Sequence, residues 1–232
     1  MNTIANQILF EDNHLIIINK LPSQIVQGDK TGDEPLSELI KKYIKEKYNK
    51  PGNVFLGVVH RLDRPVGGIV IFARTSKALS RLNQQLKNRQ IKKIYWAVVK
   101  NPPPEKSGQL IHCIYRNEKK NKSFITNDRK SGSKEAILNY QLVGKSERYF
   151  LLEVELLTGR HHQIRAQLAH IGCPIKGDMK YGYDRTNPDG SIHLFARSVE
   201  LAHPVSKEAI KIIAQPPKDQ LWDYFVGFVA EK

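Results

Sequence analysis

One turn between two apolar, β-branched runs constrains this chain more than any other feature. Residues 54–59 and 69–72 are rich in Val, Ile and Phe, a composition typical of buried strands. The turn between them carries Asp63, with Arg61 and Arg64 on either side. Because an unpaired charge is costly to bury, the pattern predicts that a cation holds Asp63. It also marks Asp63 as the candidate catalytic group.

A second polar motif contains the cation that we expect beside Asp63. Residues 158–165 read Thr-Gly-Arg-His-His-Gln-Ile-Arg, and residues 161–171 are predicted to form a short helix. On that helix Arg165 shares a face with apolar residues, so its side chain should turn inward. A planar guanidinium can bind both oxygens of a carboxylate. We therefore predict that Arg165 pairs with Asp63, the alternative being a salt bridge with a structural role alone.

These motifs, with two others, resemble those of a known family. The four stretches are His-Arg-Leu-Asp at residues 60–63, Lys-Ile-Tyr-Trp-Ala at 93–97, the motif at 158–165, and Gly-Cys-Pro-Ile-Lys-Gly-Asp at 172–178, followed by Tyr-Gly at 181–182. Together they resemble the RluA family of RNA pseudouridine synthases, and the resemblance spans about residues 9–215. It implies an isomerase that converts uridine to pseudouridine in RNA.

The resemblance also implies roles for individual residues. Asp63 would be the essential carboxylate, acting by stabilising positive charge on the ribose, by attacking it, or by removing a proton from it. Arg165 would pair with Asp63. Tyr95 would stack on the flipped uracil, its hydroxyl being a candidate to move the proton at C5. Arg61 would accompany extrusion of the target base, although a backbone or phosphate contact is an alternative role.

The expected contacts with RNA or substrate form a larger set. By its place in the apolar periodicity of the short helix, Leu168 is an ordinary core residue, yet we include it in this set. The set consists of Arg61, Arg64, Lys92, Lys93, Arg160 and Leu168.

Charge favours a polyanionic partner. The chain has 37 Lys and Arg against 23 Asp and Glu, a formal net charge of +14. Residues 64–104 contain nine Lys or Arg and no Asp or Glu, a one-signed stretch suited to phosphates. We expect the partner to be RNA, either transfer RNA or ribosomal RNA. The alternative is a noncatalytic, basic RNA-binding protein, which would explain the charge but not the acid within a full catalytic motif.

Other residue classes exclude several functions. Cys113 and Cys173 are the only cysteines, so neither a disulfide framework nor a Cys-x-x-Cys metal site is supported. His161 and His162 lack the His-Glu-x-x-His pattern of zinc hydrolases. No apolar run approaches the length of a membrane span. We therefore expect a cytoplasmic monomer that needs neither a metal nor an organic cofactor and does not bind a membrane.

Strand signals outnumber helix signals, and no repeated βαβ pattern occurs. Strands are predicted at residues 15–19, 54–59, 69–72, 94–99, 110–115, 136–143, 149–157, 194–201 and 209–214, and helices near 36–44 and from a cap at Ser76. We read residues 116–135 as a mobile hairpin or loop that is able to close over a substrate, the alternative being an ordinary flexible connection. The class is α+β. By resemblance we expect the pseudouridine synthase fold, a single catalytic domain over residues 1–232 with a central, largely antiparallel mixed sheet beside a basic cleft, and no N-terminal S4 domain.

Overall fold

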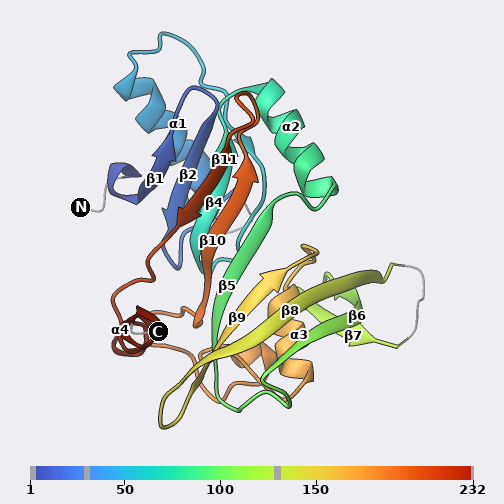
Figure 1. Ribbon diagram of the computed structural model, residues 1–232. Helices are drawn as coiled ribbons and strands as arrows, with labels where there is room; N and C mark the ends of the chain where they lie inside the picture. The colour runs from blue at the N-terminus through green and yellow to red at the C-terminus, as the bar shows by residue number, and fades with distance from the viewer. Residues whose placement is uncertain (1–3, 29–31, 128–131, 231–232) are drawn as a thin grey trace. The chain divides into compact units, whose positions relative to one another are not determined.

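The computed structural model describes residues 4–28, 32–127 and 132–230 (Figure 1). These residues divide into two compact units. The first unit holds the chain up to Ile91 together with the segment Arg197–Gln215. The second holds Lys92–Ala196 and the C-terminal residues from Pro216 onward. Strand β10 (Leu194–Ala202) starts in the second unit and continues into the first.

A largely antiparallel part of the sheet forms the centre of the first unit. Its strands are β1 (Ile8–Glu11), β2 (Leu15–Lys20), β3 (Gly57–Val58), β4 (Gly67–Ala73), the later part of β10, and β11 (Ala209–Ile213). The pairs β1–β2, β2–β4, β3–β4 and β10–β11 are antiparallel. Every residue of β4 is buried, as its unbroken apolar sequence predicts for a central strand.

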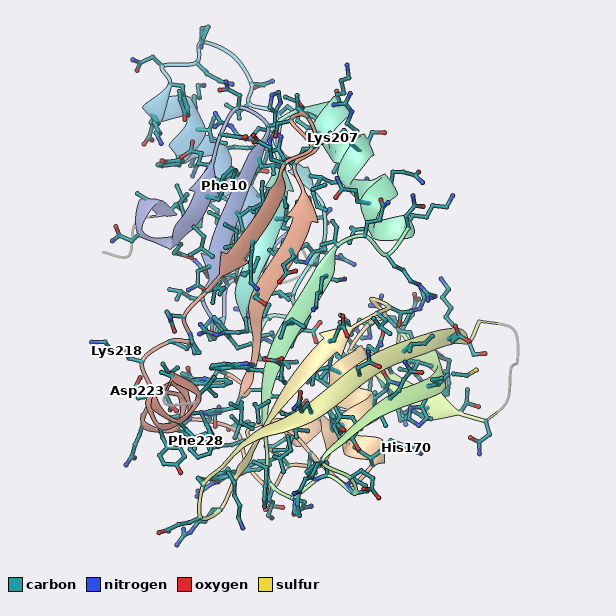
Figure 2. The ribbon with its side chains drawn as sticks, in the orientation of Figure 1. Phe10, His170, Lys207, Lys218, Asp223 and Phe228 are labelled. Atoms are coloured by element: carbon teal, nitrogen blue, oxygen red, sulfur yellow. The ribbon has the colours of Figure 1, made fainter. Side chains whose placement is uncertain are left out.

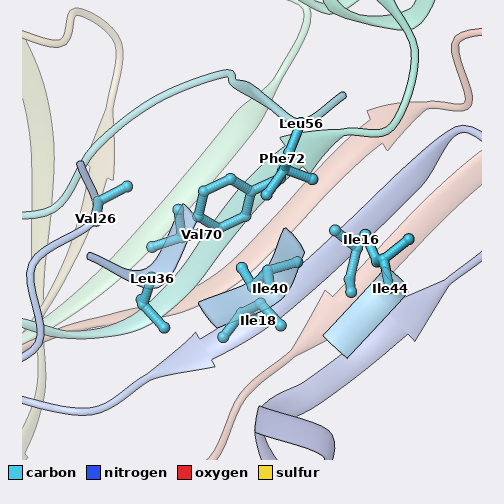
Figure 3. Close-up of a cluster of buried hydrophobic side chains, with 9 residues drawn as sticks. All are labelled: Ile16, Ile18, Val26, Leu36, Ile40, Ile44, Leu56, Val70 and Phe72. Carbon is cyan, nitrogen blue, oxygen red and sulfur yellow. The ribbon is translucent and has the colours of Figure 1, made fainter. Parts of the chain in front are cut away.

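Two helices belong to the first unit: α1 (Leu36–Lys47) and α2 (Ser76–Lys87). The apolar stripe of α1 packs on one face of the sheet, as Figure 3 shows for Ile40 between Ile18 and Phe72. Side chains of this cluster come from α1, β2, β4 and the segments before α1 and β3. A 3₁₀ turn, η1 (Ile4–Gln7), precedes β1.

Two local predictions in this unit were wrong. Thr75, rather than Ser76, caps α2, because the Thr75 hydroxyl accepts a hydrogen bond from Ala78 N at 3.1 Å. Of residues 54–59, only Gly57 and Val58 pair as a strand. Leu56 and Val54 instead contribute side chains to the cluster under α1, so their apolar character reflects packing rather than strand pairing.

Strands of the second unit pair antiparallel in the order β5-β9-β8-β6-β7. Its strands are β5 (Lys92–Val99), β6 (Ser107–Asn117), β7 (Lys122–Thr126), β8 (Lys134–Lys145) and β9 (Phe150–Leu156). Helix α3 (Gln163–His170) contacts β6 and β7, sharing a small core with Ile114 and Ala136. A 3₁₀ turn, η2 (Met179–Tyr181), and helix α4 (Gln220–Ala230) complete the unit.

The predicted α+β class with a largely antiparallel sheet is confirmed. Of the two predicted forms of residues 116–135, a hairpin or a loop, the hairpin is confirmed, because β7 pairs with β6; residues 128–131 lie outside the described residues. Helix α4 was not predicted. It packs against β8, where Gly144 lies close to Phe225 and Phe228.

Candidate active site

The predicted catalytic carboxylate lies on a tight turn in the first unit. Asp63 is half-buried between β3 and β4, which confirms the predicted turn. Val66 N donates to the backbone oxygen of Asp63 at 3.0 Å and so closes the turn. Arg61 and Arg64 flank it as exposed side chains, and Arg64 forms an ion pair with Asp33 at 2.6 Å.

A buried lysine supports this turn from β2. Lys20 has no solvent exposure. Its ammonium group donates to the backbone oxygens of Leu21 at 3.1 Å, Arg64 at 3.1 Å and Val66 at 2.6 Å. Two of these acceptors belong to the Asp63 turn, and the three N–H groups of an ammonium match three acceptors. Lys20 therefore fixes the backbone that carries Asp63.

Two opposing effects act on the pKa of Lys20. Burial lowers the pKa of Lys20 to about 7, while the negative charge of Asp63 acts in the opposite direction. Sequence analysis missed this residue, because a strand prediction of residues 15–19 ended one position too early. The available signal was a lysine at the end of an otherwise apolar strand.

In the second unit, Arg165 is held by a carboxylate that sequence analysis did not assign to it. Arg165 lies on α3 and is 5% exposed, which confirms that it turns inward. Its Nε and Nη2 atoms each donate to one oxygen of Asp178 at 2.7 Å. Asp178 is 1% exposed. This two-bond geometry fixes the plane of the guanidinium. The pairing of Arg165 with Asp63 stays a prediction.

The turn that carries Asp178 is built for this contact. Gly177 has φ +88°, and a side chain at that position would meet Ser191 O and the Asn187 side chain. The Asp178 backbone oxygen accepts hydrogen bonds from Tyr181 N and Tyr183 N. Asp178 thus sits on a rigid loop, and its carboxylate has little freedom to leave Arg165.

Tyr181 connects Arg165 to the β6–β7 hairpin. Its ring centroid lies 5.0 Å from Arg165 Cζ, a cation–π distance. Its hydroxyl accepts from Ser123 N at 2.8 Å, donates to Ser123 O at 3.1 Å, and lies 3.0 Å from His162 Nδ1. Burial, reinforced by the nearby charge of Arg165, lowers the pKa of His162 to about 2. His162 is therefore neutral, in line with an orienting role.

The remaining predicted residues of the second unit fall into two groups. Tyr95 and Leu168 are buried, Tyr95 at 5% exposure opposite Val154 of β9 and Leu168 at 0% within the core. The complete burial of Leu168 supports its core role, so we leave it out of the proposed RNA contacts. Lys92 and Arg160 are exposed.

Lys93 and Arg160 have distinct surroundings. Lys93 is half-buried, and burial lowers its pKa. Arg160 Nε donates to Glu135 O at 2.8 Å, which ties the motif at 158–165 to the start of β8. The structure thus groups Asp63, Arg61 and Arg64 in the first unit and the other predicted residues in the second.

Two further observations concern metal binding and membrane-spanning helices. Within the described ranges, no three His, Cys, Asp or Glu side chains are grouped so that they could hold a metal ion. Within the same ranges, no helix has both the length and the hydropathy of a membrane span.

Comparison with solved structures defines the fold class. The chain superposes on human RNA pseudouridylate synthase domain containing 4 with a TM-score of 0.78, covering 98% of this chain and 94% of that one at 21% identity. Human RNA pseudouridylate synthase domain containing 1 gives a TM-score of 0.71, with 97% and 95% covered at 18% identity. The chain therefore has the pseudouridine synthase fold.

Sequence comparison identifies the family. Residues 14–170 match the family model described as RNA pseudouridylate synthase. The ribosomal large subunit pseudouridine synthase C of Buchnera aphidicola (subsp. Baizongia pistaciae) is 32% identical over 90% of this chain and 66% of its own length. Synthase D of Xylella fastidiosa is 32% identical over 93% and 67%. The chain belongs to the RNA pseudouridylate synthase family, a family of isomerases, and spans about two thirds of the length of these relatives.

Replacing Lys20 tests its support of the Asp63 turn. In the unfolded chain a lysine titrates near 10.5, whereas burial brings the pKa of Lys20 to about 7. Between these values the unfolded state holds more protons, so the stability of the wild type should rise with pH relative to Lys20→Met, at up to about 1.4 kcal/mol per pH unit. Urea unfolding of both proteins at about pH 6, 8 and 9 measures the difference. If the difference in stability between the two proteins stays constant over this pH range, the lowered pKa of Lys20 is contradicted.

Proposed function

We propose that this protein is an RNA pseudouridine synthase that isomerises specific uridines in structured RNA, with Asp63 as its essential catalytic group. Family membership supports the reaction class. The observation that carries the assignment of Asp63 is its place on a closed turn whose backbone is held by the buried ammonium of Lys20. Such a fixed carboxylate suits a reaction in which positive charge develops at one atom.

The proposed reaction needs a carboxylate on the sugar face of the uridine. The bond between ribose C1′ and uracil N1 breaks, the base turns, and C1′ bonds to C5. The C5 proton is lost and N1 gains one, so the reaction is an isomerisation without a net redox change. An ionised oxygen of Asp63 can stabilise the electron-poor ribose, attack it, or take a proton from it. All three routes need the ionised form.

Arg165 is the proposed partner that keeps Asp63 ionised and aimed. Asp178 engages Nε and Nη2 of Arg165, a grip that orients the guanidinium before substrate binds. Asp178 is therefore proposed as a positioning residue that acts through Arg165. Because Tyr181 packs against the same guanidinium, the group is held on two sides.

Other residues are proposed to bind the RNA. Tyr95 would stack on the flipped uracil, and Arg61 would enter the stack as the base leaves it. Arg64, Lys92, Lys93 and Arg160 would contact phosphates. Ribosomal RNA is the first substrate to test, because two relatives are named as ribosomal large subunit synthases; transfer RNA is the second. We propose that the protein acts as a monomer in the cytoplasm and needs no metal.

A noncatalytic RNA-binding protein is the competing function, and Asp63→Asn separates the two. The substitution keeps the size of the side chain and removes its charge, so turnover should fall at least about a thousandfold. Affinity for RNA should stay within about threefold, because the lost charge repels phosphates rather than binding them. The assay separates the nucleosides by chromatography before mass spectrometry, because uridine and pseudouridine have the same mass. The RNA is extracted from cells that lack the gene and incubated with each protein.

Asp223→Asn is the matched control for Asp63→Asn. Asp223 is an exposed residue of α4, and its substitution should leave turnover unchanged. Wild-type turnover in Asp63→Asn would refute the catalytic assignment of that residue. A wild-type protein that binds RNA but forms no pseudouridine on any fraction would favour the noncatalytic alternative.

Asp178→Asn tests the positioning role. An amide has one oxygen where the carboxylate has two, so one of the two hydrogen bonds to Arg165 is lost. A guanidinium N–H group then faces the NH₂ group of the amide, which is also a donor. We expect kcat to fall about 10- to 100-fold with little change in KM. Asp178→Glu, which keeps the charge, should recover part of the loss.

Stability and a control keep this test specific. The exposed Asp184, which pairs with Lys100, provides Asp184→Asn as the control, with expected wild-type kinetics. A kcat of wild-type size in a folded Asp178→Asn protein would show that Asp178 does not position Arg165. Equal losses in Asp178→Asn and Asp178→Glu, in step with lower stability, would assign it a structural role only.

A further inference from the structure

The two surface helices of the first unit differ in how their charges are compensated. On α1, three cations have acidic partners: Lys41 pairs with Glu38 at 2.8 Å, and Lys47 pairs with Glu11 at 2.7 Å. Lys42 likewise pairs with Glu34. Much of the positive charge on this helix is therefore neutralised locally.

Helix α2 lacks this compensation. It lies within residues 64–104, which contain nine Lys or Arg and no Asp or Glu. In the part of the chain that the structure describes, no carboxylate lies within ion-pair distance of Lys77, Lys87 or Arg89. All three side chains are exposed. Their field therefore reaches solvent undiminished by a local partner.

The polar side of α2 forms one continuous surface. Ala78, Leu82 and Gln85 are buried, so helical spacing places the polar residues together on the opposite side. We call this surface the α2 face and define it as Lys77, Ser80, Arg81, Asn83, Gln84, Lys87, Asn88 and Arg89. Its members are cations and neutral hydrogen-bonding residues, the side chains that contact nucleic-acid phosphates.

The neighbouring turn between β10 and β11 fixes this helix. Gln85 Nε2 donates to Ala202 O at 2.9 Å, and Arg81 Nη1 donates to Pro204 O at 2.8 Å. Lys207 follows in the same turn and is exposed (Figure 2). The α2 face is thus presented on a rigid element, and docking it requires no rearrangement of the helix.

We propose that the α2 face docks on the phosphate backbone of the RNA substrate. The identity of the partner rests on the proposed function. RNA fits better than an anionic membrane, because none of the exposed large apolar side chains belongs to α2 and an interfacial helix needs an apolar side to enter lipid. The contact is independent of base sequence, since phosphates carry none. It holds the RNA, while residues at the active site select the uridine.

Paired variants with equal loss of charge test this proposal. Lys77→Gln with Lys87→Gln removes two cations from the α2 face. Lys41→Gln with Lys42→Gln removes two cations from α1 that have the acidic partners Glu38 and Glu34. Dissociation constants are measured against KCl concentration for two probes, a large-subunit ribosomal RNA fragment and an unrelated RNA hairpin. Glutamine favours helix, so both variants should fold, and thermal unfolding checks this.

The α2 variant should bind both RNAs at least about fivefold more weakly at about 0.1 M KCl, and its salt slope should fall by about 1 to 2. The α1 variant should stay within about twofold of the wild type. Equal losses in the two variants, or no loss in the α2 variant, would overturn the proposal. Vesicles of anionic phospholipid are a further probe. If the α2 variant binds these vesicles more weakly than the wild type does but binds RNA as well as the wild type does, the proposal is also overturned.

These binding measurements are separable from the proposed function. If the α2 variant loses RNA affinity as expected while the wild type forms no pseudouridine, the docking surface stands and the enzymatic function fails. If the wild type forms pseudouridine and the α2 variant keeps both its affinity and its salt slope, the function stands and the docking surface fails.

Discussion

A carboxylate that must stay ionised in a partly buried turn needs cations that are themselves held in place. Lys20 meets this requirement in the first unit, where three backbone oxygens surround its ammonium. The hydrogen bonds and the charge of Asp63 offset only part of the cost of burying that charge, since burial still lowers the pKa of Lys20 to about 7. If Lys20 were replaced by an apolar residue, the oxygens of Arg64 and Val66 would lose their donor, and the turn that aims Asp63 would loosen.

In the second unit, a buried carboxylate holds the cation in place. Arg165 is buried against Asp178, and the two hydrogen bonds between them leave the guanidinium little freedom to rotate. Breaking such a pair costs far more than an exposed salt bridge contributes, because one charge would stay buried without its partner. The network through Tyr181 to Ser123 extends this rigidity to the β6–β7 hairpin.

Sequence patterns predicted most strands, the inward turn of Arg165 and the turn that carries Asp63, because each follows from local periodicity. They missed what depends on distant partners. Asp178 follows Arg165 by 13 positions, and nothing in helical spacing links the two. Lys20 lies 44 residues from Arg64, so its contact with the turn is a product of strand pairing. Helix α4 was missed because its aromatic residues serve tertiary packing against β8, which local patterns do not reveal.

The central claim is that the guanidinium of Arg165, fixed by Asp178, stabilises the ionised carboxylate of Asp63. A crystal structure of the wild-type protein, with the Asp63 and Arg165 side chains resolved, tests it most directly. The account predicts an oxygen of Asp63 within about 4 Å of a guanidinium nitrogen of Arg165. A carboxylate that points away from Arg165, with both of its oxygens well beyond that distance, would contradict it.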